Sequence, residues 1–127
     1  MVIPRFIINF LTLLIFSTKM WIEPNKELPK IKQDVLVATP STIGVTISSY
    51  WGDGGPTDGW TNMGVTHWMS LPKFSAESWN TIDTPPEKRV KVLGYHPKIG
   101  MITVFYWGSE SWSLSGITHW ISLPLLP

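Results

Sequence analysis

Two histidines stand in nearly identical surroundings and are the first candidates for chemistry. The string Thr-His-Trp occurs at residues 66–68 and again at residues 118–120. An imidazole can act as a general base or a metal ligand because it titrates near neutral pH. No carboxylate recurs beside the two histidines and the chain has no cysteine, so the ligand set of a typical zinc site is missing. We therefore predict that His67 and His119 are structural, that neither a metal nor another cofactor is bound, and that the protein is not an enzyme.

The segments around these histidines are also alike, which predicts an internal duplication. Residues 64–72 and 116–124 differ only by one Val-to-Ile and one Met-to-Ile exchange. All eight tryptophans pair between the halves: Trp21 with Trp79, Trp51 with Trp107, Trp60 with Trp112, and Trp68 with Trp120. We predict two tandem copies of one tryptophan-rich module, residues 21–72 and 79–124, joined by a linker of residues 73–78.

The composition is that of an ordered protein without a strong charge. Hydrophobic residues make up 43% of the 127 residues, charged residues make up 15%, and the formal net charge is +1. A chain this hydrophobic can form a core, whereas so small a basic excess gives no electrostatic attraction for a nucleic acid. We expect one compact body and no nucleic-acid partner.

Each copy is predicted to be a three-stranded antiparallel meander. Residues 35–37 and 45–51 are rich in β-branched and aromatic side chains and flank a turn at residues 40–44, which is typical of a hairpin. A third strand is expected over residues 65–71, and over 117–123 in the second copy. Three short strands alone leave one apolar face uncovered. We therefore predict an all-β fold in which the two modules pack into one small pseudo-symmetric sandwich or barrel.

The alternation of side chains along the third strand predicts a contact face. Val65 and His67 fall on the apolar face of this strand. Trp68 falls on the other face, between the hydroxyl groups of Thr66 and Ser70. Tryptophans on such a face, or at the edge of a loop, stay partly exposed and are typical of binding surfaces. The predicted contact residues are Trp60, Trp68, Trp112, Trp120, Thr66 and Thr118, and the remaining tryptophans, Trp21, Trp51, Trp79 and Trp107, are expected in the core.

The middle strands of the two copies differ in polarity. Thr46 and Ser48 of the first copy correspond to Ile102 and Val104 of the second. We predict that the second module supplies more of the common core and that the polar strand face of the first stays open for contact.

The N-terminal segment, residues 1–19, is a hydrophobic extension with three open interpretations. Its apolar run, residues 6–16, follows Arg5 and is shorter than the roughly 20 residues that a membrane-spanning helix needs. It fits the first two parts of a secretory signal, but no small-residue cleavage site follows. The three interpretations are an export signal or membrane anchor, a translation start at Met20 directly before the first copy, and a packed helix.

The motif that ends each copy carries a family resemblance. The string Thr-His-Trp-Met-Ser-Leu-Pro, preceded by Trp21, a Leu-Pro and a Val-Leu-Val strand, resembles the domain-of-unknown-function family 551, which ends in a Thr-His-Trp-Met-Pro-Leu-Pro-like string. Ser70 and Ser122 stand where that family usually has proline. The resemblance covers residues 21–72 better than residues 79–124. It implies an accessory protein of a bacteriophage or prophage, without an activity that could be transferred.

Three functions from different classes follow from these observations. The leading one is a phage or prophage accessory binding protein in the cytoplasm of an infected or lysogenic bacterium, with a host protein, a phage protein or a small ligand as partner and host takeover or counter-defence as the role. The first alternative is an exported or membrane-tethered protein that binds carbohydrate or envelope, with membrane contact only if residues 1–19 are retained. The second alternative is an unrecognised enzyme.

Overall fold

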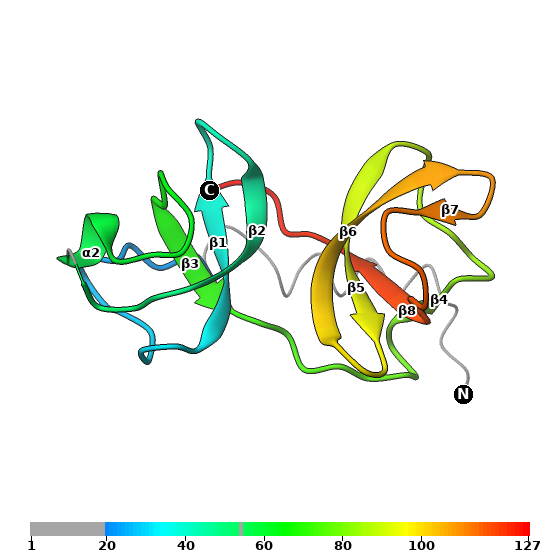
Figure 1. Ribbon diagram of the computed structural model, residues 1–127, viewed down its shortest axis with the longest axis horizontal. Helices are drawn as coiled ribbons and strands as arrows, with labels where there is room; N and C mark the ends of the chain where they lie inside the picture. The colour runs from blue at the N-terminus through cyan, green and yellow to red at the C-terminus, as the bar shows by residue number, and fades with distance from the viewer. Residues whose placement is uncertain (1–19, 54) are drawn as a thin grey trace. The chain divides into compact units, whose positions relative to one another are not determined.

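The computed structural model describes residues 20–53 and 55–127, and these form antiparallel strands in two sheets (Figure 1). The predicted all-β class is confirmed. One short helical turn, α2 (Gly55–Asp58), lies in the loop that follows β2. The hydrophobic segment of residues 1–19 lies outside the described residues. Among the residues that are described, no helix has the length and apolar character needed to cross a membrane.

The described chain divides into two compact units. Residues 20–72 together with residues 124–127 form one, called here the N unit, and residues 73–123 form the other, called the C unit. The C-terminal residues are tied into the N unit by a hydrogen bond, because the Trp21 indole N–H donates to the carbonyl oxygen of Leu125 at 2.9 Å. The N unit therefore contains both ends of the described chain.

The N unit contains three strands in the order β2-β1-β3: β1 (Asp34–Thr39), β2 (Gly44–Ser49) and β3 (His67–Ser70). Both pairings are antiparallel, with Leu36 opposite Ile47 on one side and opposite Met69 on the other. Single bridges extend this sheet at both edges, Ile22 with Trp68 beyond β3 and Tyr50 with Trp60 beyond β2. The N unit thus has five paired segments.

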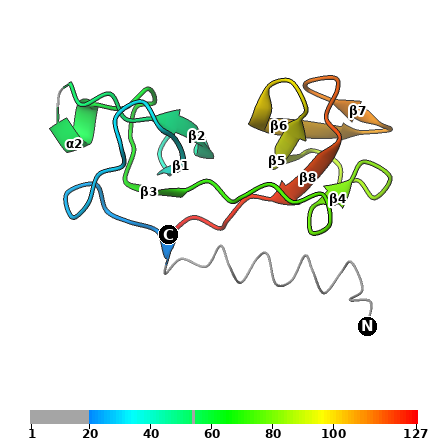
Figure 2. The same cartoon turned by 90° about the horizontal axis from the view of Figure 1, so that it is seen from below.

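The C unit has the same order of pairing. Its five strands are ordered β4-β8-β5-β6-β7, and Figure 2 shows β7 folding back along β6 at the edge of the sheet. Their bounds are β4 (Asn80–Thr81), β5 (Val90–His96), β6 (Gly100–Gly108), β7 (Ser111–Trp112) and β8 (His119–Ser122). Counting the two bridges of the N unit as strands, the segments of the two units pair in one and the same order.

Each unit buries a hydrophobic cluster of its own. The cluster of the N unit consists of Val35, Val37, Tyr50, Trp60, Val65 and Trp68, with Ile22 packed against it. The cluster of the C unit consists of Val92, Val104, Ile117 and Trp120, with Val90, Ile102, Trp112 and Leu114 packed against it. Removing this much apolar surface from water is the main favourable term in folding.

The third strand of each unit is shorter than predicted, and this changes its faces. β3 begins at His67 rather than at residue 65, and β8 begins at His119. Val65 therefore does not share a face with His67, because it lies before the paired ladder and packs in the same cluster as Trp68. Alternation applies only within a continuous strand. The assignment of Trp68 to a polar, partly exposed face is consequently wrong.

The polar positions of β2 are not an open contact face. Ser48 is buried, and its hydroxyl oxygen accepts a hydrogen bond from the backbone N–H of Asn62 at 3.3 Å. Thr46 is partly buried. A short hydroxyl side chain is tolerated inside because it finds a backbone partner. The prediction that this face of the first module stays open is wrong at Ser48.

Candidate binding surfaces

The two histidines occupy equivalent places and make equivalent contacts. Nδ1 of His67 lies 2.9 Å from Oγ1 of Thr66, and Nδ1 of His119 lies 2.9 Å from Oγ1 of Thr118. Each threonine hydroxyl also donates to a backbone carbonyl oxygen at 3.4 Å, that of Ala38 or its counterpart Tyr95. Both imidazoles are partly buried. No group of three His, Cys, Asp or Glu side chains that could hold a metal occurs among the described residues.

Three of the four tryptophans predicted for the contact face are buried. Trp60, Trp68 and Trp120 are only 7%, 5% and 7% exposed. Their indole N–H groups donate to the carbonyl oxygens of Pro56, Glu27 and Thr84, at 2.8, 2.8 and 2.9 Å. A buried indole N–H needs such an acceptor. Here the acceptors of Trp68 and Trp120 lie in loops distant along the chain, and that of Trp60 lies in the nearby α2 turn. These three side chains are core residues, which corrects the prediction.

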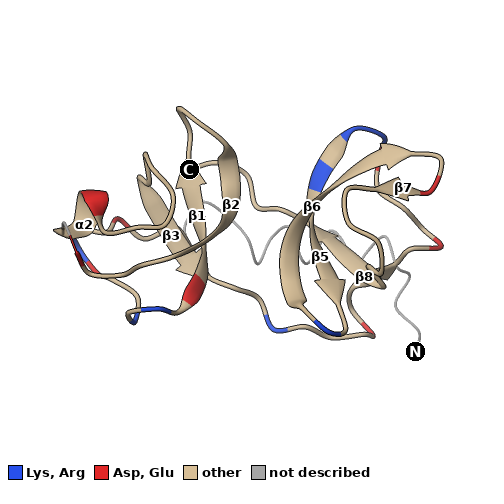
Figure 3. Ribbon diagram, viewed as in Figure 1, with Lys and Arg blue, Asp and Glu red and all other residues tan. Residues whose placement is uncertain are grey.

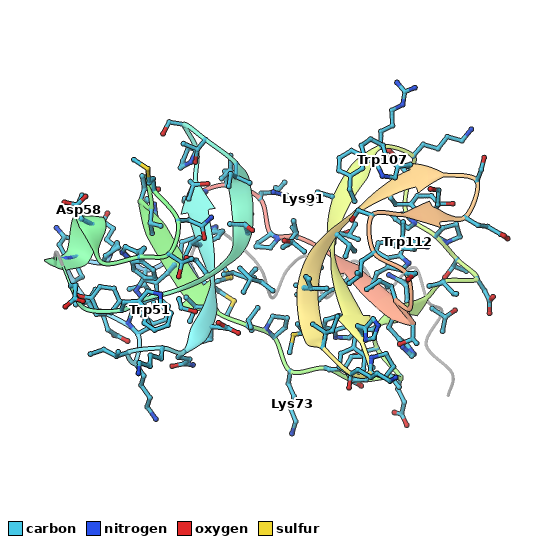
Figure 4. All side chains as sticks on the ribbon, viewed as in Figure 1. Trp51, Asp58, Lys73, Lys91, Trp107 and Trp112 are labelled. Atoms are coloured by element: carbon cyan, nitrogen blue, oxygen red, sulfur yellow. The ribbon has the colours of Figure 1, made fainter. Side chains whose placement is uncertain are left out.

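The prediction that Trp51 and Trp107, both labelled in Figure 4, lie in the core is wrong. Their side chains are about half exposed, with exposed fractions of 48% and 55%. Each directly follows a buried tyrosine, Tyr50 just after β2 or Tyr106 within β6, that takes the inward position. Because side chains alternate, the next residue points outward. The structure thus presents one exposed tryptophan at the same place in each unit.

In the N unit this exposed tryptophan is held in position by its neighbours. The Trp51 indole N–H donates to Oγ1 of Thr61 at 2.7 Å, and Nζ of Lys32 lies 5.9 Å from the ring centroid. That separation is within the range of a cation–π interaction. Ile31 also packs here, because its Cδ1 lies 3.3 Å from where a Cβ on Gly52 would be. We call Trp51, Lys32, Ile31 and Thr61 the N-unit surface.

In the C unit the equivalent surface is more aromatic and more basic. The ring of Phe105 lies 4.2 Å from that of Trp107. Lys88 packs on Gly108, with Cγ 3.0 Å from a Cβ built there, and Arg89 follows it in the chain. The Lys and Arg residues of this segment gather at the start of β5 in Figure 3. We call Phe105, Trp107, Lys88 and Arg89 the C-unit surface.

Lys91 lies on β5 next to this surface, opposite Phe105 in the β5–β6 pairing. Burial lowers the pKa of its ammonium below that of an exposed lysine, because water stabilises the charged form less well there. Its counterpart in the β1–β2 pairing of the N unit is Asp34, opposite Ser49, whose hydroxyl donates to the aspartate at 2.6 Å. The two surfaces therefore have equivalent tryptophans, Trp51 and Trp107, but neighbours of opposite charge, Asp34 and Lys91.

Each exposed tryptophan also has a basic neighbour with unusual backbone geometry. Lys32 has φ 67° and Arg89 has φ 60°, both in the left-handed region that non-glycine residues rarely adopt. The backbone N–H of Lys32 donates to the carbonyl oxygen of Tyr50 at 2.8 Å, and that of Arg89 to Tyr106 at 2.7 Å. Holding such a conformation costs on the order of 1 kcal/mol or more per residue. Both units place a basic side chain at this strained position.

A groove of about 680 Å³ opens beside β7 in the C unit. Residues that line it include Ile82, Asp83, Tyr106, Glu110, Trp112 and Ile117. Trp112 is the one predicted contact tryptophan that remains partly exposed, and its ring packs 4.7 Å from that of Tyr106. In the N unit the equivalent pair, Tyr50 and Trp60, is covered by the longer loop that contains α2. This groove was not predicted from the sequence, although the shorter loop of the C unit, residues 108–111 against residues 52–59, is a signal that could have found it.

The fold and these surfaces define a small all-β protein with exposed aromatic side chains. Residues 20–75 match the model of a family described as protein of unknown function (DUF551). The match supports the family resemblance found in the ending motif, over the N-terminal half of the chain. No curated protein and no solved structure matches the chain.

Proposed function

We propose that this chain is a non-enzymatic binding protein that holds an acidic protein partner through the N-unit and C-unit surfaces. The observation that carries the proposal is the repeated arrangement of a half-exposed tryptophan beside a basic residue with positive φ. Trp51 with Lys32 and Trp107 with Arg89 occupy equivalent places in the two units. In keeping with the family resemblance, we place this role in a phage or prophage accessory protein inside the bacterial cell.

The chemistry of these side chains favours a protein partner. Tryptophan and arginine dominate the binding energy of protein interfaces, because they bury a large area at their centre and pair with charged groups. An exposed tryptophan leaves water-contacting apolar area that a partner can cover. Lys88 and Arg89 beside Trp107 make no ion pair with any described residue. An acidic partner would complement them and associate faster at low salt.

The proposal is tested by capturing partners from the bacterial host with the full chain. We expect one or more acidic proteins to be retained by the wild type and lost with a Trp51→Ala, Trp107→Ala double variant. The matched control changes Ile43 and Ile99 to alanine, since these are equally exposed apolar residues at equivalent hairpin turns. Retention of the same proteins by the tryptophan variant, or their loss with the isoleucine variant, would contradict the proposal.

A further inference from the structure

We propose that the groove beside β7 in the C unit is a binding site for a neutral saccharide. This site is separate from the surfaces around Trp51 and Trp107 and does not depend on them. Its volume of about 680 Å³ is in the range of small-molecule sites. Three kinds of group meet in it: a tryptophan, two carboxylates and apolar side chains.

Among the described residues, the indole N–H of Trp112 has no hydrogen-bond partner, unlike that of Trp60. The Trp60 indole N–H donates to the carbonyl oxygen of Pro56 in the α2 turn. Trp112 occupies the equivalent place in the C unit, but residues 108–111 are four residues shorter than residues 52–59 and bring no carbonyl to it. Within the described part of the chain the Trp112 N–H donates no hydrogen bond, although the residue lines the groove. It is a donor available to a ligand.

The loop that replaces α2 in the C unit has a strained backbone. Gly108 pairs with Ser111, so the hairpin turns through Ser109 and Glu110 alone. These two residues have φ 50° and φ 62°, the combination of a tight hairpin turn that favours Asn-Gly. Neither Ser nor Glu relieves the cost of this geometry as glycine would. A glutamate held in a strained turn at the rim of a groove indicates a role for its side chain.

Acceptors and a further donor complete the polar lining. Asp83 and Glu110 both line the groove, and Figure 3 shows acidic residues in the β6–β7 loop and in the loop after β4. The one ion pair among the described residues joins Lys26 and Glu23, so neither carboxylate is neutralised by a cation. The Tyr106 hydroxyl accepts the backbone N–H of Glu110 at 3.1 Å, which leaves its own proton free to donate.

This combination selects among ligand classes. A hydroxyl group can both accept from the Trp112 indole and donate to Asp83 or Glu110. A protonated amine offers no acceptor for the indole N–H, and an anion would be repelled by the two carboxylates. Ile82 and Ile117 give the groove apolar walls suited to the C–H faces of a sugar ring. The lining therefore fits a neutral saccharide better than a cation or an anion.

The test is heteronuclear NMR of the indole N–H groups of the full chain during titration. The probes are maltotriose, cellotriose and tri-N-acetylchitotriose, with butylamine and inorganic phosphate as charged comparisons. We expect at least one saccharide to move the Trp112 indole signal while the Trp60 signal stays in place. Trp112→Phe keeps the aromatic packing but removes the N–H, and should weaken the binding about fivefold, the worth of one hydrogen bond. Trp60→Phe is the matched control and should leave the affinity unchanged.

A loop exchange gives an independent arm of the same test. Replacing residues 108–111 by the sequence of residues 52–59 should cover Trp112 and abolish the saccharide shift in a folded protein. A Trp112 signal that no saccharide moves, that only butylamine or phosphate moves, or saccharide binding unaffected by Trp112→Phe, would each overturn the proposal. Trp112→Phe and Trp60→Phe change no residue of the N-unit or C-unit surface, so partner capture with these two variants separates a failure of this proposal from a failure of the proposed function.

Discussion

The N unit and the C unit pair their segments in the same order but fill their cores from different strands. On β1 and β2 the N unit has Val37, together with the short Ser48. At the corresponding places on β5 and β6 the C unit has Gly94, together with the larger Val104. A Cβ added to Gly94 would lie 2.8 Å from Cγ2 of Val104 and 3.2 Å from Cδ1 of Ile117. Either strand can therefore supply the side chain that fills this core space, provided the other strand carries a smaller residue there.

The largest effect is expected where the two units are most alike. Trp68 and Trp120 are both buried, and both donate their indole N–H to a loop carbonyl. Replacing either by alanine should lower the free energy of unfolding of its unit by about 4 kcal/mol, because a large cavity and an unpaired carbonyl remain. Chemical denaturation, monitored with a separate signal from each unit, measures this change in the free energy of unfolding. A loss under about 1 kcal/mol at one of them would show that the equivalence of the two units is incomplete.

The Gly94 contact predicts a coupling within the C unit alone. Gly94→Ala should destabilise the C unit by about 2 kcal/mol, because the new methyl group overlaps Val104. The same change should cost markedly less in a Val104→Ala background, where the clashing Cγ2 is absent. A double-mutant cycle on denaturation midpoints measures this coupling. Equal costs in the two backgrounds would contradict the shared-volume explanation.

A smaller difference in stability is expected between Trp60 and Trp112, whose rings pack against Tyr50 and Tyr106. Trp60→Phe removes an indole N–H that is bonded to Pro56 and should cost about 1 kcal/mol. Trp112→Phe removes an N–H that makes no such bond, so its cost should be smaller by about that amount. Thermal unfolding of the two variants measures the difference in stability loss between the covered edge of the N unit and the open edge of the C unit. Identical losses would mean that the α2 loop contributes nothing at Trp60.

The smallest effects on stability are expected at the exposed tryptophans. Trp51→Ala and Trp107→Ala should each change the free energy of unfolding by less than about 1 kcal/mol, because both rings are half in water. Trp51→Ala should be the more costly of the two, since its indole N–H is bonded to Thr61. Parallel denaturation curves measure the order. A loss of several kcal/mol at either position would place that ring in the core after all.

Local pattern was enough to predict the strand-rich class and the hairpins of both units. Val35 and Val92 begin runs of apolar and β-branched residues, and such runs favour β-strands without reference to the rest of the fold. The turns that end at Gly44 and Gly100 were also predictable, because glycine adopts positive φ without steric cost. Both glycines have φ near 92° in the structure. These features depend on neighbours in the sequence.

The exposure of each tryptophan could not be read in the same way. Trp68 is buried because Glu27, distant along the chain, brings a carbonyl to its indole, and Trp120 is buried because Thr84 does the same. Trp51 is exposed because Tyr50 takes the inward place. Trp112 at the β7 edge of the C unit stays partly exposed because the loop of residues 108–111 is too short to cover it. Such outcomes are decided by tertiary partners, which the spacing of one residue type does not encode.

The hydrogen bond between Trp21 and Leu125 has a consequence for the order of events during synthesis. The residues that it joins are 104 positions apart, and the whole C unit is encoded between them. Contacts so distant in sequence form late and slow the folding of the parts they complete. The C unit is therefore synthesised before the carbonyl of Leu125 can accept the Trp21 hydrogen bond. The N unit begins to be translated first, yet its contacts are completed after those of the C unit can form.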